Sequence, residues 1–377
     1  MLEFRDLKKQ YACLKDDIDS AIAKVCSSAH FIGGSEVSEL EADLASYIGV
    51  KHCISCANGT EAITLALMAW GIKPRDAVFV PDFTFFASAE APALIGATPV
   101  LVDVDQNTFN IDPQKLEQAI LAVLEEGELK PKAVIAVDLF GLPANYAAIR
   151  EICSRFNLLL LEDAAQGFGG AIDKQRACSF GDISTTSFFP AKPLGCYGDG
   201  GAIFTDNDEW ASLIRSFAVH GKGSMKYDNV RIGVNSRLDS IQAAILKVKL
   251  RAFKDFELNA VNKVAEYYTR ALKNTLFEVP FVPGGYFSSW AQYTLRLSEG
   301  VNRDDLQVYL RENGIPSMVY YPKPLAAQSA LQGIAKKYAE NEVTASLCKR
   351  VVSIPMHPYL EVEEMDQIIC SIKNFFI

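Results

Sequence analysis

The chain has 377 residues, of which 49% are hydrophobic and 22% charged, as in an ordinary globular protein of about two domains. This composition excludes a disordered chain, a collagen-like rod and a small secreted scaffold held together by disulfides. Acidic residues outnumber basic ones by 46 to 37, and the formal net charge of -9 disfavours general binding to nucleic acid or to anionic membranes.

The first residues of the chain carry charges where an export signal would need an apolar core. No run of about 18 apolar residues predicts a membrane span. The nine cysteines are scattered and odd in number, so free thiols in a reducing cytoplasm are expected. The Cys53 and Cys56 pair has no second cysteine pair and no nearby histidine pattern, and the four histidines show no metal-ligand spacing, so no metal site is expected.

Short apolar runs alternate with amphipathic stretches between about residues 50 and 205. The apolar runs predict strands at 77–80, 99–104, 133–137 and 158–161. The amphipathic stretches predict helices, including 113–124 and 146–156. Apolar strands separated by helices are typical of a parallel sheet that is covered on both faces. Ligands of such sheets bind at the carboxyl ends of the strands, so the residues that follow each strand are site candidates.

From about residue 236 the pattern changes to longer helices. The predicted elements are a helix from Arg237 through Lys263, a strand at 289–297, a helix at 303–313, an extended stretch at 315–321 and a helix at 363–375. The chain is therefore expected to have an α/β fold with two parts. Residues 1–250 form a large domain on a mostly parallel sheet, and 251–377 form a smaller α+β domain.

Three segments carry candidate chemistry. The strand at 158–161 runs into Glu162 and Asp163, which places a carboxylate at the ligand edge, although Asp163 could instead cap a following helix. Lys192 stands between two prolines and before a glycine-rich run, where a desolvated amine could form a Schiff base, although it could also be a plain turn residue. Gly59 and Thr60 open a predicted helix that offers a phosphate site or only an ordinary cap.

Together, the runs Glu162–Gln166 and Ser187–Lys192 resemble those of the DegT/DnrJ/StrS sugar aminotransferases, which use pyridoxal 5'-phosphate (PLP). The resemblance covers nearly the whole chain, from Phe31–Gly34 to Pro355–Pro358, and implies the type I fold of PLP-dependent transferases. Within the family, the run Lys192–Gly201 looks most like UDP-2-acetamido-2-deoxy-ribo-hexuluronate aminotransferases. Those enzymes make a 3-amino sugar for surface polysaccharide such as lipopolysaccharide.

The resemblance also implies roles for the catalytic and cofactor-binding residues. Lys192 would bind PLP covalently and then move the proton at the substrate carbon. Asp163 would keep the pyridinium nitrogen protonated, and Gln166 would bond the ring oxygen. Phe85 would stack on the ring, with core packing as its alternative.

For the phosphate and the partner subunit, the resemblance implies binding by Gly59, Thr60 and Ser187. Asn235 would reach the phosphate in the neighbouring subunit of a homodimer with shared active sites, with a local turn as its alternative. The arginine two residues later, Arg237, is expected to bind a substrate carboxylate, unless it pairs with Asp239.

The predicted activity is transfer of an amino group from L-glutamate to a nucleotide-linked keto sugar, with a UDP-linked 3-keto uronic sugar as the leading candidate. Tyr320 and Tyr321 are the expected sugar contacts, although relatives often carry histidine at the position of Tyr320. The alternatives are a 4-aminotransferase or another keto-sugar aminotransferase of the family, a PLP-dependent sugar dehydratase, and a non-catalytic PLP-binding regulator. Dehydratase relatives often replace the lysine with histidine, so Lys192 favours transamination.

Overall fold

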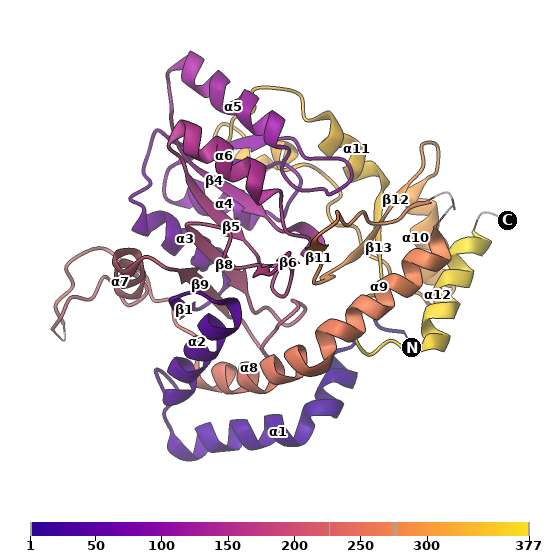
Figure 1. Cartoon of the computed structure of the whole chain (residues 1–377), viewed down its shortest axis with the longest axis horizontal. Helices are drawn as coiled ribbons and strands as arrows, with labels where there is room; N and C mark the ends of the chain where they lie inside the picture. Colours follow the sequence, from indigo (N-terminus) through magenta and orange to yellow (C-terminus); the bar gives the residue numbers. More distant parts are fainter. Residues whose placement is uncertain (1, 226, 274, 276, 376–377) are drawn as a thin grey trace.

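A seven-stranded sheet with helices on both sides forms the centre of the molecule (Figure 1). The computed structural model describes residues 2–225, 227–273, 275 and 277–375. In spatial order the strands are β1 (His52–Cys56), β9 (Gly201–Thr205), β8 (Ile183–Ser187), β5 (Leu159–Asp163), β4 (Lys130–Val137), β2 (Asp76–Pro81) and β3 (Thr98–Val102). All neighbouring pairs from β8 to β3 are parallel, and only β9 runs antiparallel to its neighbours. The prediction of a mostly parallel sheet is confirmed.

Two hydrophobic cores lie on the two faces of this sheet. One face packs against α2 (Ser35–Ile48), α5 (Pro113–Glu126), α6 (Tyr146–Phe156) and α8 (Ser240–Ala252). The other packs against α3 (Gly59–Ala69), α4 (Ala87–Leu94), α7 (Asp208–Phe217) and α11 (Glu342–Arg350). Successive residues of a strand point into opposite cores. In β2, Phe79 packs in the first core, whereas Val78 and Val80 pack in the second.

The long helical region after the sheet begins later than predicted. The helix expected from Arg237 starts at Ser240, because Asp239 takes the extended conformation of an N-cap residue. It then continues through a π-helical turn, Phe253–Glu257, into α9 (Leu258–Leu272). Residues 235–238 are thereby left outside the helix, beside the large sheet.

A third core belongs to the C-terminal part of the chain. It lies between α9, α10 (Arg303–Glu312), α12 (Val362–Asn374) and an antiparallel sheet of β10 (Phe277–Glu278), β12 (Tyr293–Leu297) and β13 (Val351–Ile354). The strand predicted at 289–297 is thus limited to β12, and the extended stretch at 315–321 makes only a bridge between Met318 and Ser353.

The two parts of the chain are interleaved. A small sheet of β11 (Tyr286–Phe287), β6 (Ala171–Ile172) and β7 (Gln175–Arg176) joins them, and Leu325, Leu331 and Leu347 pack into a core of the large sheet. The proposed boundary between residues 250 and 251 therefore stays a prediction.

The N-terminal helix α1 (Leu7–Ser28) packs along α8 through Ile18, Ile245 and Val248. All nine cysteines are free. Among the residues that the structure describes, no helix is long and apolar enough to span a membrane, and no group of three or more side chains could hold a metal ion.

Candidate active site

Asp163 lies buried at the carboxyl end of β5, where two donors fix its carboxylate. Ser88 Oγ donates to Oδ2 at 2.8 Å, and the backbone N of Ala165 donates to Oδ1 at 3.2 Å. Burial raises the pKa of Asp163, whereas the bond from Ser88 and the charge of Lys192 oppose that rise. Residues 164–170 form turns instead of a helix, so the helix-cap alternative for Asp163 is wrong.

The neighbouring carboxylate, Glu162, points away from Asp163, as successive residues of a strand do. Its oxygens accept hydrogen bonds from the backbone N of Cys178 at 2.5 Å, the backbone N of Phe180 at 2.7 Å and Ser184 Oγ at 2.7 Å. These bonds tie Glu162 into the interior of the fold. Of the two carboxylates at the end of β5, only Asp163 is left for a ligand.

Lys192 lies in the loop between β8 and β9 and is partly buried. Its backbone N donates to the carbonyl oxygen of Phe189 at 2.8 Å, and its own carbonyl accepts a bond from Arg5 Nη2 at 2.8 Å. Burial lowers the pKa of Lys192, while the charge of Asp163 opposes the change. A lowered pKa leaves more of the amine neutral and nucleophilic, which favours the Schiff-base role over a plain turn.

The start of α3 lies against the end of β8, where the sequence predicts a phosphate site. Asn58 caps the helix by accepting a bond from the backbone N of Glu61 at 2.8 Å. A Cβ placed on Gly59 would come within 2.8 Å of Ser187 Cβ, so the two segments are in close contact. The amide groups of the first helical turn have no intrahelical acceptor and point toward this junction. Asn58 is therefore the cap, and Gly59, Thr60 and Ser187 surround a position suited to phosphate.

This close contact predicts that Gly59→Ala weakens cofactor binding. The added methyl group would push α3 away from Ser187 and disturb the anion site, so we expect the dissociation constant for PLP to rise by about tenfold or more. Fluorescence titration of the cofactor-free protein with PLP would measure the change. Gly284→Ala is the matched control, because a Cβ at Gly284 meets nothing within 4 Å. Equal PLP affinity in the two variants would contradict this role of Gly59.

Gln166 is held in one orientation by a backbone donor. The backbone N of Phe140 donates to Gln166 Oε1 at 2.8 Å, and a backbone N–H can only donate, so the amide nitrogen faces the other way. Gln166 Nε2 then donates to the hydroxyl of Tyr321 at 3.1 Å and keeps a second hydrogen. That hydrogen suits the predicted bond to the ring oxygen of PLP.

Tyr321, which Gln166 bonds, belongs to a group of aromatic side chains. Phe85 is 54% exposed, so the core-packing alternative for it is wrong, and its neighbour Phe83 is the buried one. The ring centre of Phe85 lies 6.4 Å from that of Tyr321, which in turn lies 5.8 Å from that of Tyr320. The structure thus brings both predicted sugar-contacting tyrosines to the same place as the predicted stacking residue.

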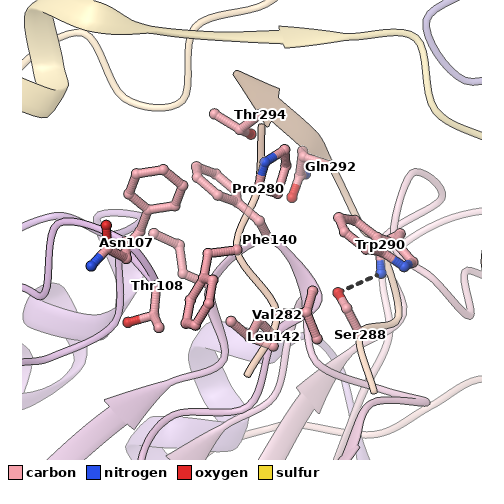
Figure 2. Close-up of a pocket in the computed structure, with 13 residues that line it drawn as sticks. Asn107, Thr108, Phe140, Leu142, Pro280, Val282, Ser288, Trp290, Gln292 and Thr294 are labelled. Carbon is pink, nitrogen blue, oxygen red and sulfur yellow. Dashed lines mark hydrogen bonds between the residues drawn. The ribbon is translucent and has the colours of Figure 1, made fainter. Parts of the chain in front are cut away.

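Phe140 also forms part of a small cavity between the large sheet and the C-terminal part of the chain (Figure 2). Two loops of the large sheet line it with residues 107–109, Leu139, Phe140 and Leu142, and the C-terminal part lines it with residues 280–282, Ser288, Trp290, Gln292 and Thr294. The cavity holds about 20 Å³, enough for a water molecule, which could satisfy the buried and unpaired Oε1 of Gln292. It is too small for a nucleotide sugar.

Within the described residues, no hydrogen bond or ion pair links Asn235 or Arg237 to the other predicted site residues. Both are exposed, whereas Ser236 between them is buried and accepts a bond from the backbone N of Ala57 at 3.1 Å. In the part of the chain that the structure describes, Arg237 makes no ion pair, so the pairing with Asp239 is not found. The phosphate role of Asn235 and the carboxylate role of Arg237 stay predictions.

The structure adds two residues that sequence reasoning missed, Ser88 and Arg5. Ser88 follows Phe85 by three residues and lies in the first turn of α4, and its place shortly after a parallel strand was the available signal. Arg5 contacts Lys192 across 187 positions of sequence, and no local pattern indicates such a contact.

The residues present fit PLP. A fixed carboxylate is available for its ring nitrogen, a desolvated amine for its aldehyde carbon, and a helix N-terminus with Ser187 for its phosphate. Gln166 has a spare N–H for the ring oxygen, and Phe85 presents an exposed ring near Tyr321, which Gln166 bonds.

Comparison with known proteins agrees with this site. Relatives include a UDP-2-acetamido-2-deoxy-3-oxo-D-glucuronate aminotransferase from Pseudomonas aeruginosa, 46% identical over 99% of this chain and 100% of its own length. A pleiotropic regulatory protein from Geobacillus stearothermophilus is 41% identical over 98% of this chain and 97% of its own. The crystal structure of a DegT DnrJ EryC1 StrS aminotransferase from Brucella abortus is 49% identical, with a TM-score of 0.96 over 100% of this chain and 99% of that one.

Residues 12–373 match the model of one protein family, which is nearly the whole chain. This match and the solved relatives confirm the predictions of an enzyme with the type I fold, of aminotransferase activity and of PLP as its cofactor. The chain belongs to the DegT/DnrJ/EryC1/StrS aminotransferase family.

Proposed function

We propose that this enzyme transfers the amino group of L-glutamate to a UDP-linked 3-keto uronic sugar. The observation that carries the proposal is the 46% identity, over essentially the full length of both chains, to the P. aeruginosa aminotransferase for such a sugar. The product would serve surface polysaccharide, such as lipopolysaccharide, and the reaction would take place in the cytoplasm.

The residues of the site divide the work between them. When bound, PLP supplies an electron sink for the carbon that gains or loses the amino group. Lys192 would hold the cofactor covalently, and its amine would move the proton at that carbon. Asp163, fixed by Ser88, keeps the ring nitrogen protonated, and Gln166 orients the ring.

The enzyme is proposed to be a homodimer with shared active sites. The loop after α7 projects from the body of the molecule (Figure 1), and Asn235 and Arg237 are exposed where this loop returns toward α8. In this loop the side chain of Ile232 is 89% exposed. Phe31 lies close by, because its carbonyl oxygen accepts a bond from the backbone N of Ser240, and its side chain is 46% exposed. Exposed apolar side chains of this kind favour burial against a second copy.

Hybrid dimers test the shared site. Neither Lys192→Ala nor Asn235→Ala alone should be active at the wild-type level, but a dimer with one of each would contain one intact site. We therefore expect activity to recover in purified hybrids that carry two different affinity tags. If hybrids are no more active than the parent variants, each site is built from a single chain.

The sugar half-reaction tests the substrate. The enzyme in its pyridoxamine 5'-phosphate form would be mixed with the UDP-linked 3-keto uronic sugar or with its counterpart that carries a hydroxymethyl group in place of the carboxylate. The proposal predicts preference for the uronate and a loss of this preference in Arg237→Lys, which keeps the charge but loses the fork. Equal rates with both sugars would contradict the uronate assignment.

A PLP-binding regulator without turnover is the second candidate, because the relative from G. stearothermophilus is named a regulatory protein. Lys192 and Asp163 favour catalysis, since binding alone would require neither a desolvated amine nor a fixed carboxylate. Lys192 also argues against the dehydratase alternative. Turnover of L-glutamate separates the aminotransferase from both.

A further inference from the structure

Arg5 connects the N-terminus of the chain to the lysine loop. The segment before α1 crosses the C-terminal part of the molecule, where the carbonyl of Phe4 accepts a bond from the backbone N of Met356 at 3.2 Å. The ring centre of Phe4 lies 6.2 Å from that of Tyr320. The next residue, Arg5, donates from Nη2 to the carbonyl oxygen of Lys192 at 2.8 Å. Arg5 thus lies between the lysine loop and the tyrosines of the candidate site.

The charge of Arg5 has no carboxylate partner within the described residues. Burial lowers the pKa of Arg5 to about 10, against the opposing charge of Glu257. Glu257 is itself engaged, because its Oε1 accepts bonds from Gln10 Nε2 at 2.7 Å and from the hydroxyl of Tyr359 at 2.5 Å. Lys249, another buried cation in this region, has its pKa lowered to about 8 by burial.

A partly desolvated arginine without an ion pair costs free energy unless an anion binds there. A guanidinium has five N–H donors, and only one of those of Arg5 has a partner in the described part of the chain. The remaining donors can bind a carboxylate through two parallel hydrogen bonds. Arg5 therefore offers unused anion-binding donors next to the lysine loop.

We infer that Arg5 binds the carboxylate that a substrate brings next to Lys192. This inference rests on the proposed function, in which both L-glutamate and the uronic sugar carry a carboxylate. The amino donor is the favoured source, because its α-carboxylate is attached directly to the reacting carbon, which must lie at the Lys192 amine. The carboxylate of a 3-keto uronic sugar is several bonds from its reacting carbon, which leaves it to the more distant Arg237.

The test uses the holoenzyme and the variants Arg5→Met, Arg5→Lys and Lys9→Met. Lys9→Met is the matched control, since it removes one positive charge from the same end of the chain. Unlike Arg5, Lys9 already has a carboxylate partner, Glu364, at 3.0 Å. Calorimetry would measure binding of glutarate, an unreactive dicarboxylate, and absorbance would follow L-glutamate and the keto sugar in separate half-reactions. We expect glutarate and L-glutamate to bind about tenfold or more weakly in Arg5→Met, with partial recovery in Arg5→Lys.

Each outcome has a defined meaning. A loss confined to the keto sugar would keep the carboxylate role of Arg5 and assign it to the uronate. Unchanged glutarate, L-glutamate and sugar binding in Arg5→Met would overturn the inference. It would also be overturned if only the pH titration of the cofactor absorbance changed, because Arg5 would then merely position the lysine loop. If the wild type does not react with L-glutamate, the proposed donor fails, while the glutarate and sugar measurements still decide the role of Arg5.

Discussion

Lys192→Ala is expected to abolish covalent attachment of PLP and to lower turnover by about 1,000-fold or more, because one amine provides both the attachment point and the proton transfer. The side chain is partly buried in a loop, so its loss should leave the fold intact. Borohydride reduction followed by peptide mapping would locate the modified lysine, and circular dichroism would check folding.

Lys249 makes this mapping a strict test. Among the described residues, Lys249 also has a lowered pKa, about 8, because it is buried, so it is the competing lysine for attachment of PLP. The exposed Lys174 provides a control, and Lys174→Ala should behave like the wild type. An adduct on Lys249, or on any lysine except Lys192, would refute the assignment.

Asp163→Ala is expected to lower turnover by about 100-fold or more while PLP still binds, because the carboxylate acts on charge that develops during the reaction. Ser88→Ala should have a smaller effect of a specific kind. The hydrogen bond from Ser88 favours the ionised carboxylate, so its removal raises the pKa of Asp163. The acid limb of the pH–rate profile should then move to higher pH.

Steady-state rates across pH for the wild type, Asp163→Ala and Ser88→Ala would check both expectations. Near-normal turnover in Asp163→Ala would show that the carboxylate only supports the loop after β5. If the acid limb of the pH–rate profile is the same in Ser88→Ala as in the wild type, Ser88 does not change the pKa of Asp163.

Elements with strong local signals could be predicted closely. Helix α5 is an example, because Asp112 accepts bonds from two backbone N–H groups at its start, Pro113 opens it, and Gly127 ends it with a φ of 70°. The position of Asp163 also followed from the sequence, since a continuous apolar strand leads to it. The start of α8 was predicted three residues early because helical periodicity alone does not mark an N-cap.

Contacts between distant segments were beyond the reach of sequence patterns. The bond from Ser88 to Asp163 spans 75 positions and the bond from Arg5 to Lys192 spans 187, and each depends on how the chain folds back. Asn235 and Arg237 present a further case, because their predicted ligands lie in a second copy of the chain. Their exposed positions support that expectation but do not test it.

The central claim is that Lys192 and Asp163 run a transamination with L-glutamate as amino donor. Adding L-glutamate to the holoenzyme and recording the absorbance of the cofactor tests it directly. The account predicts complete conversion from the PLP form to pyridoxamine 5'-phosphate, with one 2-oxoglutarate released per site, and return to the PLP form when the UDP-linked 3-keto uronic sugar is added. An absorbance spectrum that L-glutamate leaves unchanged, with PLP bound at Lys192, would contradict it.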